Sequence, residues 1–205
     1  MLSFYAERLA TTEINYSFRQ IPSAKTIAGW RNATPSKFKF SFKAPQKVTH
    51  FARLRDCTDT MELFNDVISK LNAKLGVVLF QLPPNFKKDT PCLKSFLETL
   101  PTNMHVAFEF RNESWFDDEV FRTLRDRNAA LCIAESENLA TPFKATSDFG
   151  YLRLRREDYM DSDVERWTAL VRKQKSQWRE VFIYFKHEET GTGPKFAQRM
   201  FELLQ

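Results

Sequence analysis

Hydrophobic residues alternate with polar ones in several short segments of this chain, which is the period-two pattern of a β-strand. In residues 106–111, Val106 and Phe108 share one side of the segment, whereas Glu109 and Arg111 share the other. The pattern predicts seven strands, near residues 11–17, 37–43, 76–82, 105–110, 129–134, 150–155 and 181–186.

Segments with hydrophobic residues at helical spacing lie between these strands. Ser23 is a candidate N-cap of a helix that ends near Arg31, and Ser114 is a candidate N-cap of a helix that ends near Arg127. An alternation of strands with helices predicts a parallel sheet with crossover helices. Further helices are expected near residues 2–9, 57–75, 90–100 and within 161–178, with a last one that ends at residue 204.

The polarity of the side chains within the predicted strands distinguishes a doubly wound sheet from a (β/α)8 barrel. A parallel strand that is packed on both faces is apolar throughout. Here one parity becomes polar toward the strand end, as at Glu109 and Arg111 and at Arg153 and Arg155. A barrel explains this pattern if the Phe-rich parity packs on the outer helices and the polar parity points inward, with the site at the carboxyl ends of the strands. We therefore predict an α/β, TIM-barrel-like fold in one domain over residues 1–205.

The composition adds a preference for an anionic partner. The chain has 205 residues, of which 42% are hydrophobic and 28% charged, as in an ordinary globular domain. Its formal net charge is +5 and its pI is about 9.1. Such an excess fits an anionic small molecule or nucleic acid as partner, and it equally fits a basic surface that aids solubility.

The cysteine pattern and the hydropathy of the chain bear on its cellular compartment. Cys57, Cys92 and Cys132 have no CxxC spacing and are odd in number, which indicates neither a disulfide framework nor a zinc site. No apolar run reaches the roughly 18 residues of a membrane span, and the first residues have no signal-peptide pattern. We expect a cytoplasmic protein with reduced thiols and no membrane partner.

Five motifs of the chain are residues 30–35 (WRNATP), 40–45 (FSFKAP) with Thr49 and His50, 80–84 (FQLPP), 108–112 (FEFRN) with Ser114 and Trp115, and 151–155 (YLRLR). Together they resemble those of the YecE-like family, which is the domain of unknown function numbered seventy-two. The resemblance implies a TIM-barrel-like fold, which has been compared with that of endonuclease IV, and it implies no particular activity. That nuclease holds its metals with histidines and carboxylates, whereas this chain has three histidines, so we expect no metal site of that kind. We also expect no organic cofactor.

The chain departs from the family pattern at its first residues. The family usually opens with a strand that carries Gly and Trp, and this chain begins inside the helix that comes after it, at Leu2. The resemblance therefore implies that the first strand is missing and that the strands near residues 11–18 and 181–186 have unpaired edges. A version extended upstream by such a strand is expected to fold more cooperatively.

Polar residues at the strand ends are expected to converge at the mouth of the barrel. Three of these residues are candidate catalytic groups. Glu109 lies among cations and could act as a general base, and Lys43 lies in a crowded site and could lose its proton readily. His50 lies on the loop that follows a strand, where such barrels build their sites. The alternative is an ion-pair network that closes the barrel and catalyses nothing. The candidate substrate-binding residues are Glu13, Asn15, Gln81, Arg111, Trp115, Arg153 and Lys186.

Two functions are compatible with this mouth. The first is an enzyme that acts on an anionic substrate, either phosphorylated or a phosphodiester. The second is a non-catalytic nucleic-acid-binding module whose basic rim supplies most of the affinity.

Overall fold

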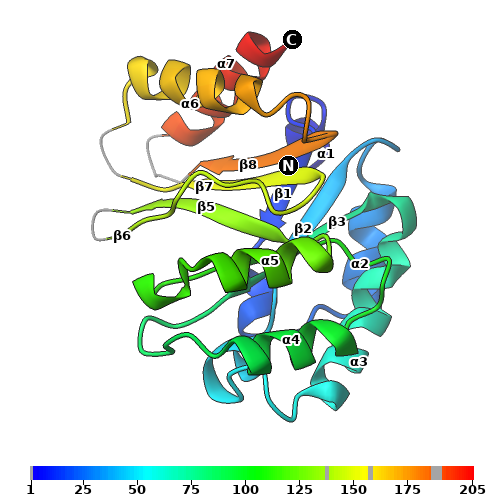
Figure 1. Cartoon of the computed structure of the whole chain (residues 1–205). Helices are drawn as coiled ribbons and strands as arrows, with labels where there is room; N and C mark the ends of the chain where they lie inside the picture. Colours follow the sequence, from blue (N-terminus) through cyan, green and yellow to red (C-terminus); the bar gives the residue numbers. More distant parts are fainter. Residues whose placement is uncertain (1, 137–138, 157–158, 186–190) are drawn as a thin grey trace.

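The structure is a computed structural model that describes residues 2–136, 139–156, 159–185 and 191–205. Within them, seven parallel strands curl into a nearly closed barrel, so the predicted fold is confirmed (Figure 1). A further strand, β6 (Leu139–Ala140), pairs antiparallel with β5 and was not predicted. The seven are, in sheet order, β1 (Thr11–Ile14), β2 (Lys39–Lys43), β3 (Leu75–Gln81), β4 (Val106–Glu109), β5 (Ala130–Ser136), β7 (Phe149–Leu154) and β8 (Glu180–Phe185).

Helices cover the outside of the curved sheet. In Figure 1, α2 to α5 lie on one side of it, and α6 and α7 lie on the other. No helix among the described residues is long and apolar enough to cross a membrane. The helices are α1 (Leu2–Ala6), α2 (Ala24–Asn32), α3 (Thr58–Ile68), α4 (Thr90–Thr99), α5 (Asp118–Asp126), α6 (Asp161–Lys173) and α7 (Thr192–Leu204), with the short turns η1 (Tyr16–Phe18), η2 (Lys47–Phe51), η3 (Ser69–Lys74) and η4 (Glu113–Trp115).

One predicted helix start is correct and one is wrong. The Ser23 hydroxyl accepts a hydrogen bond from the Thr26 N–H, 3.1 Å away, and so caps α2. Ser114 caps no α-helix, because the chain makes the turn η4 there before α5 begins. The α5 cap is the Asp117 carboxylate, which accepts from the Glu119 N–H at 2.9 Å. A carboxylate at this position also favours the positive end of the helix dipole.

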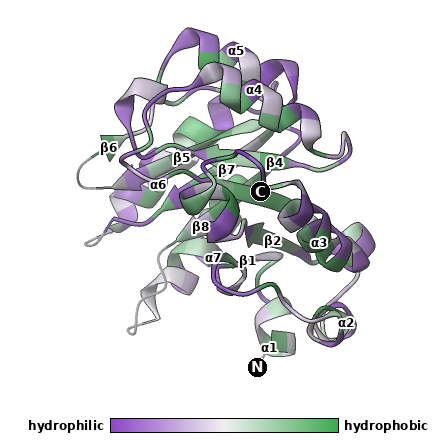
Figure 2. Cartoon of the chain, turned by 90° about the horizontal axis from the view of Figure 1, so that it is seen from below, coloured by the Kyte–Doolittle hydropathy of each residue, from purple (hydrophilic) through white to green (hydrophobic). Residues whose placement is uncertain are grey.

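The two parities of the strands face different surroundings, as the sequence predicts. Phe108 stacks on Phe80, with 5.1 Å between ring centroids, and both rings contact Phe96 of α4. Figure 2 shows hydrophobic strands enclosed by helices with polar outer surfaces. The opposite parity fills the barrel interior with Val77, Leu79, Ala107, Ala130, Cys132, Ala134, Phe149, Tyr151, Phe182 and Tyr184.

The seam between β1 and β8 is bridged by side chains. In the described part of the chain, β1 pairs with β2 alone and β8 pairs with β7 alone. Inside the barrel, the hydroxyl oxygens of Thr11 and Tyr184 lie 2.8 Å apart, and the Tyr184 hydroxyl also donates to Ser41 Oγ at 2.8 Å. Polar side-chain contacts therefore join the two edges from within.

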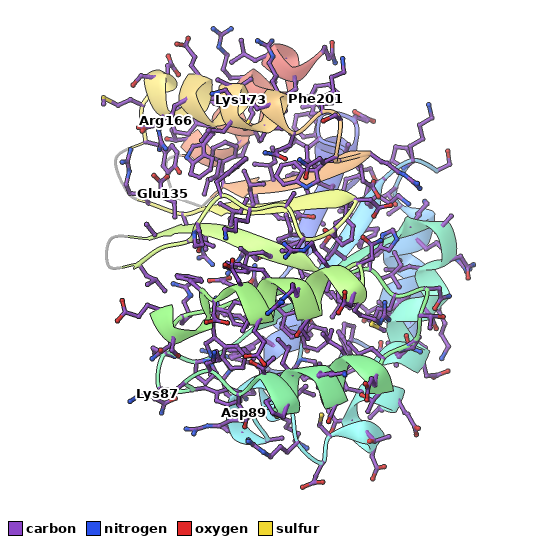
Figure 3. The ribbon with its side chains drawn as sticks, in the orientation of Figure 1. Lys87, Asp89, Glu135, Arg166, Lys173 and Phe201 are labelled. Atoms are coloured by element: carbon purple, nitrogen blue, oxygen red, sulfur yellow. The ribbon has the colours of Figure 1, made fainter. Side chains whose placement is uncertain are left out.

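A carboxylate on the outer side of β5 ties the sheet to α6. Glu135 accepts hydrogen bonds from the Trp167 indole at 3.1 Å and from Arg166 at 2.8 Å, and it also contacts the Tyr159 hydroxyl. Figure 3 shows Glu135 and Arg166 side by side at this edge. Because Glu135 has the helix-facing parity, this cluster is separate from the barrel interior.

Two glycines provide a matched test of the packing. A Cβ on Gly150 would lie 2.7 Å from the Trp178 ring, so Gly150→Ala should lower the free energy of unfolding by about 1–3 kcal/mol. Gly29 lies in α2 with no atom within 4 Å of an added Cβ, so Gly29→Ala should raise it by about 0.5–1 kcal/mol. Urea denaturation of both variants measures the changes. Equal effects would contradict the described packing of Trp178.

Candidate functional site

Glu109 is a fully buried carboxylate at the end of β4. Its Oε2 accepts from Arg153 Nη1 at 2.5 Å, and its Oε1 accepts from Gln81 Nε2 at 2.9 Å and pairs with Arg111. Burial by itself raises the pKa of Glu109, but the charges of Arg153 and Arg111 outweigh burial and hold this pKa below its ordinary value. The carboxylate is therefore ionised, and both of its oxygens have partners.

Arg153 connects opposite walls of the barrel. It extends from β7 to Glu109 on β4, and its Nη2 donates to Glu13 Oε1 on β1 at 2.8 Å and to Asn15 Oδ1 at 3.3 Å. Tyr151 donates to the other oxygen of Glu13 at 2.6 Å. Arg153 Nε is buried and has no hydrogen-bond partner among the described residues. The guanidinium thus orders both carboxylates of the mouth.

Lys43 lies at the end of β2, beside this network. Its Nζ donates to Gln81 Oε1 at 2.8 Å and lies 4.0 Å from the centroid of the Phe18 ring. Burial, together with the charge of Arg153, lowers the pKa of Lys43 to about 8. A pKa in this range lets the amine exchange its proton near neutral pH.

His50 lies in η2 on the rim and contacts the Phe18 ring, which Lys43 also contacts. The two rings meet edge to face with centroids 4.9 Å apart, and the His50 Nδ1 lies 2.9 Å from Thr49 Oγ1. Burial and the nearby charge of Lys43 lower the pKa of His50, so this imidazole is neutral at pH 7. It is the second group at the mouth that can exchange a proton.

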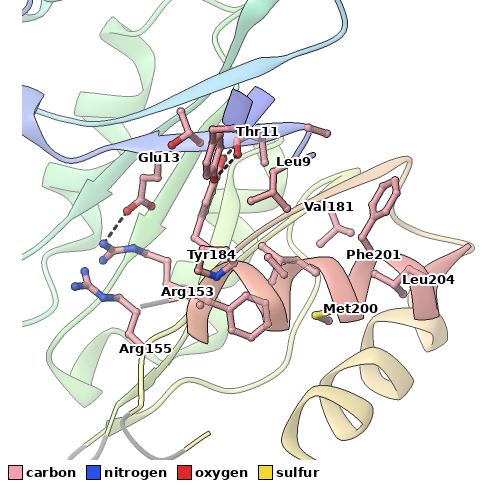
Figure 4. A pocket seen from close by; sticks show the side chains of 18 of the residues that line it. Leu9, Thr11, Glu13, Arg153, Arg155, Val181, Tyr184, Met200, Phe201 and Leu204 are labelled. Carbon is pink, nitrogen blue, oxygen red and sulfur yellow. Dashed lines mark hydrogen bonds and ion pairs between the residues drawn. The ribbon is translucent and has the colours of Figure 1, made fainter. Parts of the chain in front are cut away.

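Arg155 adds a cation that sequence reasoning did not select as a site residue. It lines a cavity together with Glu13 and Arg153, and its side chain lies beside that of Arg153 (Figure 4). It makes no hydrogen bond or ion pair with another residue in the described part of the chain. Its shared parity with Tyr151 and Arg153 is the signal that would have selected both Tyr151 and Arg155.

The structure brings most of the candidate side chains together. Trp115 lies elsewhere: it is buried on the helix side of the sheet, stacks on Phe110 at 4.8 Å, and donates from its indole to the Phe86 carbonyl at 2.7 Å. Lys186 lies outside the described residues. No group of three or more His, Cys, Asp or Glu that could hold a metal occurs within the ranges that the structure describes. The residues that converge are Glu13, Asn15, Lys43, Gln81, Glu109, Arg111 and Arg153, with His50 on the rim.

Fold and mouth together define a TIM-barrel-like α/β protein with a charged cluster at the carboxyl ends of its strands. The family model described as "Protein of unknown function DUF72" matches residues 1–205, and the chain belongs to this family. It is 32% identical to the UPF0759 protein YecE of Escherichia coli (strain K12), over 100% of this chain and 85% of the relative. It is 24% identical to the UPF0759 protein YunF of Bacillus subtilis (strain 168), over 99% of this chain and 86% of that relative.

Two solved structures share the fold. A DUF72 family protein from Enterococcus faecalis V583 superimposes with a TM-score of 0.85 at 18% identity, over 100% of this chain and 88% of that one. A DUF72 family protein from Thermotoga maritima MSB8 superimposes with a TM-score of 0.83 at 23% identity, over 95% of this chain and 84% of that one.

Removing the charge of Glu109 should destabilise the protein strongly. Glu109→Gln keeps the shape of the side chain but leaves Arg153 with one carboxylate in the interior, which should cost about 3 kcal/mol of unfolding free energy. Because the folded pKa of Glu109 is lowered, this contribution is present at neutral pH and disappears as the pH falls through that pKa. Urea denaturation at pH 7 and at acidic pH measures the change.

Glu113→Gln is the matched control, because Glu113 is exposed in η4 and the substitution is chemically the same. Its effect should stay within about 0.5 kcal/mol. Equal stability of the two variants at pH 7 would contradict the structural role of the Glu109 charge.

Proposed function

We propose that the barrel mouth binds the anionic group of a small molecule, which is a phosphate ester or a phosphodiester, and that Lys43 exchanges a proton with the bound molecule. The observation that carries the proposal is unbalanced charge. Among the residues that the structure describes, two carboxylates, Glu13 and Glu109, share the mouth with four cationic side chains, so these groups carry two positive charges in excess while Lys43 is protonated. The four cations are Lys43, Arg111, Arg153 and Arg155.

Arginine suits a phosphate because its planar fork of N–H groups matches two phosphate oxygens. Arg153 is held by Glu13 and Glu109, so its charge contributes to the field of the mouth more than to direct contact. Arg155 is exposed and has no partner among the described residues, and the Arg111 side chain is 31% exposed. These two arginines are the proposed direct ligands of the anion.

Lys43 is a better candidate for acid–base catalysis than Glu109, whose contacts suit it to position neighbouring side chains. A general base must reach the proton that it takes, whereas Glu109 is fully buried and both of its oxygens accept hydrogen bonds from cations or an amide. Glu109 accepts from the Gln81 amide nitrogen, which turns the Gln81 oxygen toward Lys43. Glu109 thereby fixes the position of the Lys43 amine, whose pKa of about 8 suits proton exchange near neutral pH.

The location of the cluster favours a small anion over a nucleic acid. The side chains of Arg153 and Glu109 are almost entirely buried inside the barrel. Non-specific nucleic-acid binding depends on many phosphate contacts spread over an exposed basic surface. A recessed cluster offers few such contacts, and it places a single anionic group next to Lys43.

Arg155→Gln should weaken the binding of inorganic phosphate without affecting folding. Removal of one partly screened charge close to the anion should lower the affinity by about threefold to tenfold. Isothermal titration calorimetry measures it. Arg125→Gln, at the far end of α5, removes the same charge from an exposed site away from the strand ends and should bind like the parent. Equal loss in both variants would indicate only a general charge effect and would contradict the site.

The nucleic-acid alternative gives a different result in the same set of variants. A single-stranded oligonucleotide would then bind more tightly than phosphate, with an affinity that falls steeply with salt. Arg125→Gln and Arg155→Gln would weaken it alike. That outcome would replace the proposed function.

Sulfate binding should weaken as the pH rises through about 8, because Lys43 then loses its proton and its positive charge. Sulfate is a suitable ligand, since its own charge does not change near this pH. Lys43→Met should bind sulfate more weakly at pH 7 and should show a flatter pH dependence than the parent. Calorimetry between pH 6.5 and 9.5 tests this, and identical pH profiles for parent and variant would rule out Lys43 as the titrating group.

A further inference from the structure

The amine of Lys43 is half-buried at the mouth and lies beside a neutral partner. Its Nζ donates to the amide oxygen of Gln81 at 2.8 Å, and it takes part in no ion pair with another of the described residues. The carboxylates of Glu13 and Glu109 pair with arginines instead. A buried ammonium group is stable next to a carboxylate, which compensates its charge. The position of Lys43 therefore disfavours the protonated form of its amine.

The charges near the amine come from β1, β4 and the end of β7. Burial and the positive charge of Arg153 lower the pKa of Lys43 to about 8. Glu109 and Glu13 partly oppose this change, and Arg155 adds to it. At pH 7, about a tenth of the molecules therefore have a neutral Lys43 amine, against fewer than about one in a thousand for a lysine with an ordinary pKa. A neutral amine has a free lone pair and is a nucleophile.

We propose that Lys43 is a nucleophile that forms an imine with an aldehyde or a ketone, and that this carbonyl compound carries the anionic group that Arg111 and Arg155 bind. The inference rests on the proposed function for the binding of the anion. It extends that function by a class of substrate, an anionic carbonyl compound, and by a covalent step.

The covalent step balances without an oxidant or a reductant. The nitrogen of Lys43 attacks the carbonyl carbon with its lone pair, and the electrons of the C=O π bond move to the oxygen. A proton passes from the nitrogen to that oxygen, which gives a carbinolamine. The oxygen takes up a second proton and leaves as water, while the nitrogen forms the C=N bond and then releases its remaining proton. Overall, an amine and a carbonyl compound give an imine and water.

His50 is suited to move these protons. Lys43 Nζ lies 4.0 Å from the centroid of the Phe18 ring, and the centroid of the His50 ring lies 4.9 Å from it. The Thr49 hydroxyl donates to the Pro45 carbonyl at 3.4 Å, so it accepts from His50 Nδ1, and the lone pair of the neutral imidazole is on Nε2. Burial and the charge of Lys43 lower the pKa of His50, so Nε2 is free at pH 7 to take up a proton and return it.

The amine and one proposed ligand of the anion are close enough for a small molecule to reach both. Gln81 accepts from Lys43 and donates to Glu109 Oε1 at 2.9 Å, and the same carboxylate oxygen pairs with Arg111. One amide side chain and one carboxylate oxygen thus separate the Lys43 amine from the Arg111 guanidinium. This span suits a compound with a few carbon atoms between its carbonyl and its anionic group, such as a short phosphorylated sugar in its open-chain form.

The test is reductive trapping on the 205-residue chain with glyceraldehyde 3-phosphate and sodium cyanoborohydride at pH 7. Cyanoborohydride reduces an imine to a stable secondary amine, and peptide mass spectrometry identifies the modified lysine. We expect Lys43 to be modified at least about tenfold faster than Lys47, an exposed lysine of η2, because a larger fraction of its amine is neutral. Equal rates at the two lysines would overturn the proposal.

Two control compounds separate imine formation from the binding of the anion. Glyceraldehyde has the same carbonyl without the phosphate, and it should modify Lys43 severalfold more slowly than its phosphate ester does. Glycerol 3-phosphate has the phosphate without the carbonyl, so it should bind in calorimetry and should slow the trapping of glyceraldehyde 3-phosphate.

Variants of the chain test the role of each side chain. Lys43→Met should reduce the total modification to the background of exposed lysines, whereas Lys47→Met is the matched control and should leave the modification of Lys43 unchanged. Arg155→Gln should slow the trapping of glyceraldehyde 3-phosphate but not that of glyceraldehyde. His50→Gln should slow trapping severalfold and leave the binding of glycerol 3-phosphate unchanged. An unchanged trapping rate in His50→Gln would overturn the role of His50 in proton transfer.

The outcomes distinguish this inference from the proposed function. Glycerol 3-phosphate that binds at the mouth, with no trapping of glyceraldehyde 3-phosphate at Lys43, would overturn the imine and leave the anion site standing. Trapping at Lys43 that is equally fast with both aldehydes, and equally fast in Arg155→Gln, would overturn the anionic class of substrate and the anion site with it.

Discussion

The buried pair of Glu109 and Arg153 is the interaction on which the rest of the mouth depends. A carboxylate and a guanidinium with no more than 1% of their side chains exposed are stable in a barrel interior only if each compensates the other. Arg153 also pairs with Glu13, so one guanidinium interacts with carboxylates on β1 and β4, two strands that are not neighbours in the sheet. This requirement constrains the relative positions of β1, β4 and β7. The remaining polar groups of the mouth lie around the buried pair.

The same pair creates the chemistry that is available at the rim. Glu109 is fully buried and both of its oxygens accept hydrogen bonds, so its contacts suit it to orient the Gln81 amide. Lys43 donates a hydrogen bond to Gln81. Its amine is also buried and lies near the positive charge of Arg153, and both effects lower its pKa. Burial and the charge of Arg153 thus lower the pKa of Lys43 to about 8, and the charge of Glu109 partly opposes this change.

The strand parities were predictable from sequence, and the partners of individual side chains were not. Period-two alternation distinguished the Phe-rich outer face from the inner face, which becomes polar toward the strand ends, and this distinction led to the barrel and to most of the mouth residues. The alternation carries no information about the segment after a strand, so Trp115 was assigned to the mouth although its ring stacks on Phe110 beneath the helices. Ser114 and Asp117 are both good caps, and only the turn η4 decides between them. Tyr151 and Arg155 share the parity of Arg153, so the alternation could have selected them, but it does not give the partner of either side chain, such as Glu13 for Tyr151.

The seam and the mouth are physically coupled through β1. In the described residues this strand has a backbone partner on one side only, so its position on the other side depends on side chains that reach it from inside the barrel. Those side chains are Arg153, Tyr151 and Tyr184, and two of them hold Glu13. Since Glu13 shares Arg153 with Glu109, any shift of β1 changes the geometry of the buried pair, and through Gln81 it reaches Lys43.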